Sequence, residues 1–132
     1  MSGRNRVALA FLILGSMALF ASTALHFFGG YTQIFPLYAA SNLNPRLKIA
    51  FQVVFLSLGW HWSVTAVVAL LAGLTATGLR KVLVLLCGLA ILIEAAVSAS
   101  MIGLFIGNEL IGAAALLLLC AGMLFAQPRA RT

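Results

Sequence analysis

Apolar residues fill four long runs of the chain, and short polar segments separate them. The runs cover residues 7–28, 49–74, 82–106 and 109–126. At a rise of 1.5 Å per residue, each run as a helix comes close to or exceeds the hydrocarbon thickness of a bilayer, which is about 30 Å. The pattern therefore predicts four membrane-spanning segments.

The runs predict helices and not strands. A transmembrane strand alternates apolar and polar residues over about ten positions, whereas a stretch such as "VLVLLCGLAILI" is apolar on every face, as a lipid-bathed helix is. The short connections "TATG" before Arg80 and "GN" at Gly107 and Asn108 make successive helices antiparallel neighbours. We expect an all-α fold in which residues 1–132 form one antiparallel four-helix bundle.

The connection between the first two runs, residues 29–45, is the longest and carries several aromatic residues. Aromatic rings collect where the membrane meets water, so this segment is predicted to lie along the outer surface as an interfacial element. Gly29 and Gly30 would permit the turn that leads into it. The aromatic residues are Tyr31, Phe35 and Tyr38.

Two polar positions have the character of helix caps. Asn44 is predicted to be the N-cap of the second helix, with Pro45 as its first residue, because proline at that position loses no hydrogen bond. Asn108 is predicted to cap the fourth helix, and Glu109 to favour the positive end of its dipole.

The composition agrees with a membrane protein. Hydrophobic residues make up 64% of the chain and charged residues 8%, with a mean hydropathy of +1.16. Soluble domains have roughly 45–50% apolar and about 25% charged residues. Membrane lipids are therefore the first partners that we expect.

The net charge of +6 is distributed unevenly between the two predicted sides. Arg46 and Lys48 alone fall on the outer side, and the other six basic residues fall at the opposite ends of the helices. This asymmetry places both termini in the cytoplasm, at a bacterial inner (cytoplasmic) membrane, and it explains the charge without nucleic acid. Cleavage of the first run as a signal peptide is the alternative. The six residues are Arg4, Arg6, Arg80, Lys81, Arg129 and Arg131.

The third run contains a series of small residues spaced by four: Ala95, Ala99, Gly103 and Gly107. Small residues at this spacing let another backbone approach closely within a membrane. We expect them to form a groove for a second copy of the chain or for a partner membrane subunit.

Four titratable groups carry the candidate chemistry: His26, His61, Glu94 and Glu109. Counted from the outer surface, His61 lies roughly 24 Å deep and Glu94 roughly 20 Å deep, so they share one layer. His26 is predicted to be about 15 Å shallower. Because an isolated charge at the bilayer centre costs on the order of 2.5–3.5 kcal/mol, we expect His61 and Glu94 to pair and to share one proton.

Polar and aromatic neighbours extend this pair into a predicted ligand site. Hydroxyls share the helical faces of both groups, and two tryptophans flank His61, so the site would suit a small apolar or cationic molecule in a cavity open to the outer side. The predicted ligand-binding residues are His61, Glu94, Trp60, Trp62, Ser57, Thr65, Ser98 and His26.

No metal site and no cofactor is predicted. The two histidines lie at different predicted depths, which excludes a haem between them, and no zinc, di-iron, nucleophile or phosphate-loop spacing occurs.

Three functions stay open. The pair could bind or translocate a small ligand or a proton, the chain could be a membrane subunit, or His61 and Glu94 could be catalytic acid and base in an enzyme acting on a lipid-soluble substrate.

Overall fold

The computed structural model describes residues 3–75 and 78–125, and every element in these ranges is a helix. Four helical stretches, residues 3–40, 45–74, 80–102 and 106–124, are long and apolar enough to cross a membrane. The predicted all-α class is therefore confirmed. The elements are α1 (Gly3–Gly29), the π-helical turn η1 (Gly30–Ile34), α2 (Phe35–Ala40), α3 (Pro45–Leu74), α4 (Arg80–Ile102) and α5 (Ile106–Leu124).

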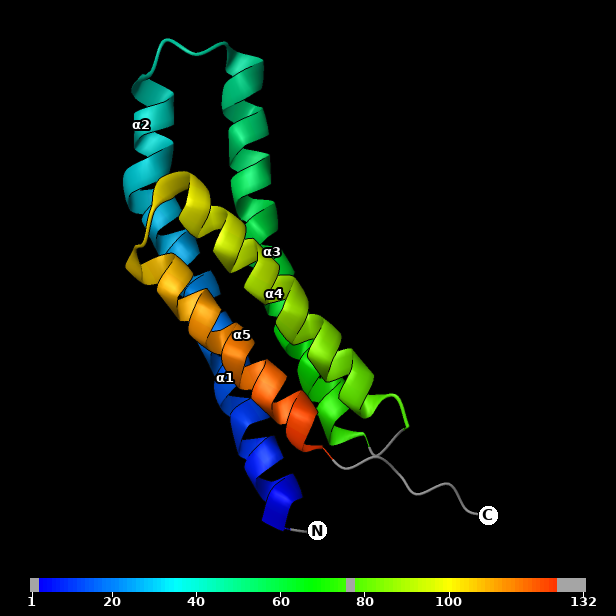
Figure 1. Ribbon diagram of the computed structural model, residues 1–132. Helices are drawn as coiled ribbons and strands as arrows, with labels where there is room; N and C mark the ends of the chain where they lie inside the picture. Colours follow the sequence, from blue (N-terminus) through cyan, green and yellow to red (C-terminus); the bar gives the residue numbers. More distant parts are fainter. Residues whose placement is uncertain (1–2, 76–77, 126–132) are drawn as a thin grey trace.

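The turn predicted at Gly29 and Gly30 is wrong, because the helix continues through it to Ala40 (Figure 1). Pro36 has no N–H to donate, and in the turn before it the Phe35 N–H reaches back five residues to the Gly30 carbonyl. This wider turn keeps the backbone helical without a sharp bend. The interfacial segment expected from residue 29 onward is instead a continuation of the first helix.

The four long helices pack as a ring in which each touches two neighbours. α1 packs against α5 and α3, and α4 packs against α5 and α3 (Figure 1). Consecutive long helices run in opposite directions, as the short connections predicted. The largest fully buried apolar side chains come from α1, α4 and α5, and they are Leu12, Leu19, Val84, Ile91 and Leu118.

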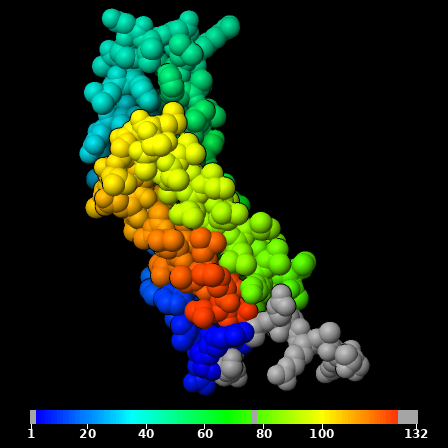
Figure 2. Space-filling model, viewed as in Figure 1, coloured from blue at the N-terminus to red at the C-terminus, as the bar shows by residue number. Residues whose placement is uncertain are grey.

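α1, α2 and α3 extend beyond the ends of α4 and α5. At 1.5 Å per residue, α4 is about 35 Å long and α5 about 29 Å, whereas residues 3–40 span about 57 Å and α3 about 45 Å. The excess forms a projecting hairpin, made of α2, residues 41–44 and the first turns of α3, at one end of the molecule (Figures 1 and 2). The Tyr38 and Phe51 rings stack in it at 5.3 Å, and Lys48 Nζ donates to the Ala39 carbonyl over 2.8 Å.

Glycines set the closest helix contacts within the bundle. A Cβ on Gly15 of α1 would lie 3.1 Å from the Ala114 carbonyl oxygen of α5. A Cβ on Gly88 of α4 would lie 3.0 Å from the Leu119 nitrogen of α5. Both distances are to backbone atoms, so a side chain there would force the helices apart. α5 is thus held closely by α1 on one side and by α4 on the other.

The prediction that the four small residues lie along one helix is wrong. α4 ends at Ile102, and Gly103 has a φ of 82°, a left-handed conformation that suits glycine and stops the helix. Gly107 belongs to α5, so only Ala95 and Ala99 lie on α4. Ala95 is buried within the chain's own bundle.

The predicted cap at Asn44 is confirmed, because its side chain accepts a 2.9 Å hydrogen bond from the Arg46 nitrogen. Asn108 is not the N-cap of α5 but lies inside its first turn, as Glu109 does. Its Oδ1 accepts from the Phe105 nitrogen over 2.9 Å and its Nδ2 donates to the Gly103 carbonyl over 2.6 Å. The Asn108 side chain thereby bridges the connection between α4 and α5. The helix α5 begins at Ile106, three residues earlier than predicted.

Replacing Gly88 with leucine should destabilise the bundle by about 1–3 kcal/mol, because overpacking would push α4 from α5. The measurement is the thermal unfolding midpoint in detergent. Gly29→Leu is the matched control, since a Cβ on Gly29 meets nothing within 4 Å. Equal losses in the two variants would contradict this packing.

Candidate functional site

His61, Trp62 and Glu94 form a polar contact between α3 and α4. His61 Nδ1 lies 3.2 Å from Glu94 Oε2, and Trp62 Nε1 donates to Glu94 Oε1 over 2.7 Å. Consecutive residues of α3 therefore engage both oxygens of the carboxylate. The structure brings His61 and Glu94 together as the depth estimate predicted, and it adds the indole N–H as a third partner.

The contact is only partly enclosed. The Glu94 side chain is 22% exposed and the His61 side chain 49%, whereas Trp62 is 8% exposed. Glu94 lies eight residues from the Ile102 end of α4, or about 12 Å, and His61 lies about 20 Å from the Leu74 end of α3. The pair is thus inside the apolar length of both helices, with its histidine on the outside of the bundle.

The shallow position predicted for His26 is wrong. Its ring lies 4.9 Å from the Trp62 ring in an edge-on contact and is stacked on Phe55 at 3.7 Å. The depth estimate failed because it placed the outer end of the first helix near Phe28, whereas this helical stretch continues to Ala40. Trp62 therefore touches His26 on one side and Glu94 on another.

Hydrogen bonds join α1 to α3 next to this contact. His26 Nε2 donates to the Phe55 carbonyl over 2.7 Å, and Thr23 Oγ1 donates to the Gly59 carbonyl over 3.0 Å. Ser63 Oγ in turn donates to Thr23 Oγ1 over 3.1 Å. Such bonds stabilise helix pairs where no water competes. The carbonyl oxygen can only accept, so His26 carries its proton on Nε2.

Gly59 makes this approach of α1 to α3 feasible. A Cβ at Gly59 would lie 2.6 Å from the Phe27 ring and 3.1 Å from the His26 ring. Thr23, Gly59 and Ser63 are not among the residues predicted from the sequence. Their spacing, with Thr23 three residues before His26 and Ser63 four after Gly59, is the signal that could have found them.

The other predicted site residues lie around the pair in different environments. Ser57 is exposed and donates to the Val53 carbonyl of its own helix. Thr65 is buried, and Ser98 is half-buried one turn from Glu94. Trp60 is 63% exposed and meets the edge of the Phe27 ring, so the two tryptophans point to different sides of α3.

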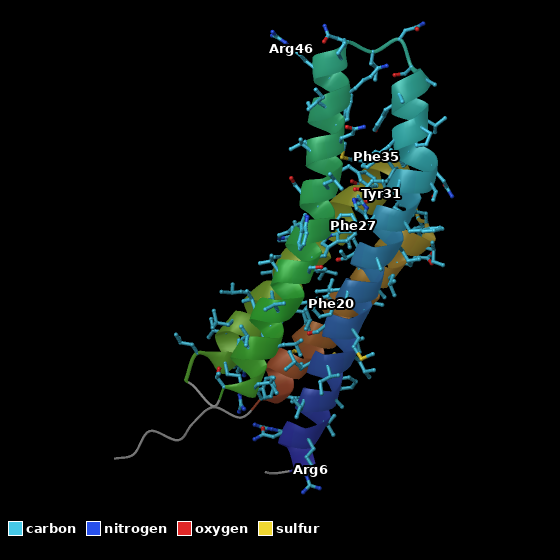
Figure 3. The ribbon with its side chains drawn as sticks, turned by 180° about the vertical axis from the view of Figure 1, so that it is seen from behind. Arg6, Phe20, Phe27, Tyr31, Phe35 and Arg46 are labelled. Carbon is cyan, nitrogen blue, oxygen red and sulfur yellow. The ribbon has the colours of Figure 1, made fainter. Side chains whose placement is uncertain are left out.

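The structure describes a shallow apolar groove between α1 and α3, but it does not include the pair. Phe20 and Phe27 lie on the side of α1 that faces α3, toward this groove (Figure 3). The cavity that we predicted around His61 and Glu94 is therefore not the groove that Trp60 borders. The groove is lined by Phe20, Trp60, Ser63, Val64, Val67 and Val68.

Within residues 3–75 and 78–125, no three His, Cys, Asp or Glu side chains gather as ligands for a metal ion. Cys87 and Cys120 are free, half-buried thiols. Comparisons with models of protein families, with curated protein sequences and with solved structures gave no match.

The chain has two tryptophans, so the Trp62 bond to Glu94 can be followed by the two indole N–H signals in NMR. Glu94→Leu should shift the Trp62 signal, because the indole loses its carboxyl acceptor, and should leave the exposed Trp60 signal in place. Trp62→Phe assigns the signals. An unchanged Trp62 signal in Glu94→Leu would contradict the bond.

Proposed function

We propose that this is an integral membrane protein in which His61 and Glu94 form a proton-holding binding site for a small ligand. The observation that carries the proposal is the contact of both Glu94 oxygens with His61 and Trp62 inside helices apolar enough to span a membrane. A charge at such a depth is costly and is kept where it has a partner and a use.

The arrangement supports a site where a proton can rest in two positions. Imidazole and carboxylate at hydrogen-bond distance can form an ion pair, or two neutral groups with the proton on Glu94. Trp62 donates to the other oxygen and holds the carboxylate in place in both forms. His61 is also open to the surroundings, so that a ligand could reach the pair without disturbing the core.

The geometry favours binding over passage through the bundle. The core beside the pair is filled by Trp62, His26 and Phe55, whose rings are in contact. The open side of the pair faces outward from the α3 and α4 contact. A ligand would therefore approach from the side of the bundle and not along its axis.

The proposed topology has both termini in the cytoplasm. Arg6 and Arg46 lie at opposite ends of the molecule (Figure 3), and Arg80 lies at the end of α4 that follows the α3–α4 connection. Arg80 also covers the Phe125 ring at 4.3 Å, which ties the start of α4 to the end of α5. Arg129 and Arg131, which contribute to the predicted bias, lie outside the described residues.

The shared proton can be tested because the chain has two acidic side chains, Glu94 and Glu109. Infrared difference spectra between acidic and alkaline buffer should contain a carboxyl band that Glu94→Gln removes and Glu109→Gln leaves. His61→Phe should move that band, because the imidazole shares its proton. A Glu94 band indifferent to His61→Phe would overturn the proposal.

The topology is testable with single cysteines in a Cys87→Ser, Cys120→Ser background. Asn42→Cys, between α2 and α3, should react with an impermeant maleimide on intact cells. Gly78→Cys, between α3 and α4, should react only after the membrane is opened. The reverse pattern would place the termini outside.

A further inference from the structure

The second ring nitrogen of His61 is the open polar position of the pair. Nδ1 faces Glu94, and among the residues that the structure describes no hydrogen-bond partner faces Nε2. The side chain is 49% exposed, so the ring can be reached from outside the bundle. A polar atom left unpaired in an apolar environment costs free energy, which a ligand that pairs with it recovers.

The number of protons in the pair determines whether Nε2 is a hydrogen-bond donor or acceptor. With one shared proton the pair is neutral overall, either as imidazolium with carboxylate or as imidazole with carboxylic acid. In the first form both ring nitrogens carry hydrogen. In the second, Nδ1 accepts from Glu94, so the ring hydrogen is on Nε2. Both neutral forms therefore present Nε2–H as a donor, and the matching ligand atom is an acceptor.

The surface around His61 is mostly apolar, and the hydroxyl of the exposed Ser57, one turn away, is bonded to the Val53 carbonyl of its own helix. Most of the nearby outward residues of α3 and α4 are exposed aliphatic side chains, and Glu94 is about 12 Å from the end of α4. In a membrane this surface is covered by hydrocarbon, so the molecule that reaches Nε2 must itself be soluble there. The exposed side chains are Leu58, Val64, Ile93 and Val97.

We infer that His61 binds, through Nε2–H, the carbonyl oxygen of an apolar molecule that enters from the membrane beside α3 and α4. A carbonyl oxygen accepts a hydrogen bond without bringing a hydrogen or a charge of its own into the hydrocarbon. Long-chain ketones, quinones and esters have this chemistry. The inference rests on the proposed function, because it uses the neutral, proton-sharing state of the pair.

The test uses the full chain in nanodiscs of ether-linked phosphatidylcholine, which contain no ester carbonyl. The probe is a benzophenone with a long alkyl chain, whose ketone is both the acceptor and the photoreactive group. We expect cross-links on α3 and α4 near His61 and Glu94. A dialkyl ketone should compete with the probe, and the alkane of equal length should not.

His61→Phe keeps an aromatic ring but removes the donor, and it should lower labelling about five-fold, the factor that corresponds to a hydrogen bond of about 1 kcal/mol. Trp60→Phe is the matched control, because this neighbouring ring points toward α1. Equal competition by ketone and alkane, or full labelling of His61→Phe, would overturn the inference.

A second measurement on the unaltered protein covers the case in which His61→Phe misfolds. The chain has two histidines, and the ¹⁵N signal of His61 Nε2 should move with the ketone and stay with the alkane, while His26 stays with both. If ester-linked lipid moves the His61 signal in the same way, a phospholipid ester is the source of the carbonyl. No shift with either carbonyl source overturns the inference.

The two proposals fail in different ways. A Glu94 infrared band independent of His61 would remove the shared proton and with it the proposed function. A coupled band without ketone preference would leave the proton site intact and remove only the carbonyl ligand.

Discussion

The contact between the Glu94 carboxylate and two consecutive residues of α3 is the interaction around which the bundle is arranged. α4 is held closely to α5 through Gly88, but its contact with α3 contains an ionisable group that needs partners. Trp62 donates to one oxygen from the core, and His61 meets the other oxygen from the surface. Both Glu94 oxygens therefore keep their partners only while α3 keeps this rotation about its own axis.

Trp62 transmits that constraint to α1. Its ring meets His26, which in turn is stacked on Phe55 and bonded to the Phe55 carbonyl. Thr23 and Ser63 continue the polar contact one turn further along the two helices. Three helices are thus fixed by a few directional bonds. This is the expected solution in lipid, where apolar surface alone gives little preference for one helix arrangement over another.

The four apolar helices and the pairing of His61 with Glu94 could be predicted from the sequence, because both follow from counting residues along long runs. Counting residues gave wrong helix ends where the conformation of a glycine was wrongly predicted. Gly29 and Gly30 carry the helix onward although a turn was expected, which misplaced His26. Gly103 was assigned to the helix and instead ends it. A glycine permits both outcomes, and tertiary contacts such as the Phe55 ring against Gly30 decide between them.

In the membrane setting that we propose, the unequal lengths of the helices would affect the surrounding bilayer. α4 and α5 match a bilayer of ordinary thickness, whereas the projecting hairpin carries exposed apolar side chains such as Leu37 and Ile49 beyond their ends. No flat bilayer of uniform thickness matches both the shorter helices, α4 and α5, and the longer pair that carries the hairpin. In a bilayer the lipid would have to thicken on the side of α1 and α3, or the molecule would have to tilt, at a cost of a fraction of a kcal/mol per Å of mismatch. The chain would thereby change the local thickness of the lipid bilayer around it.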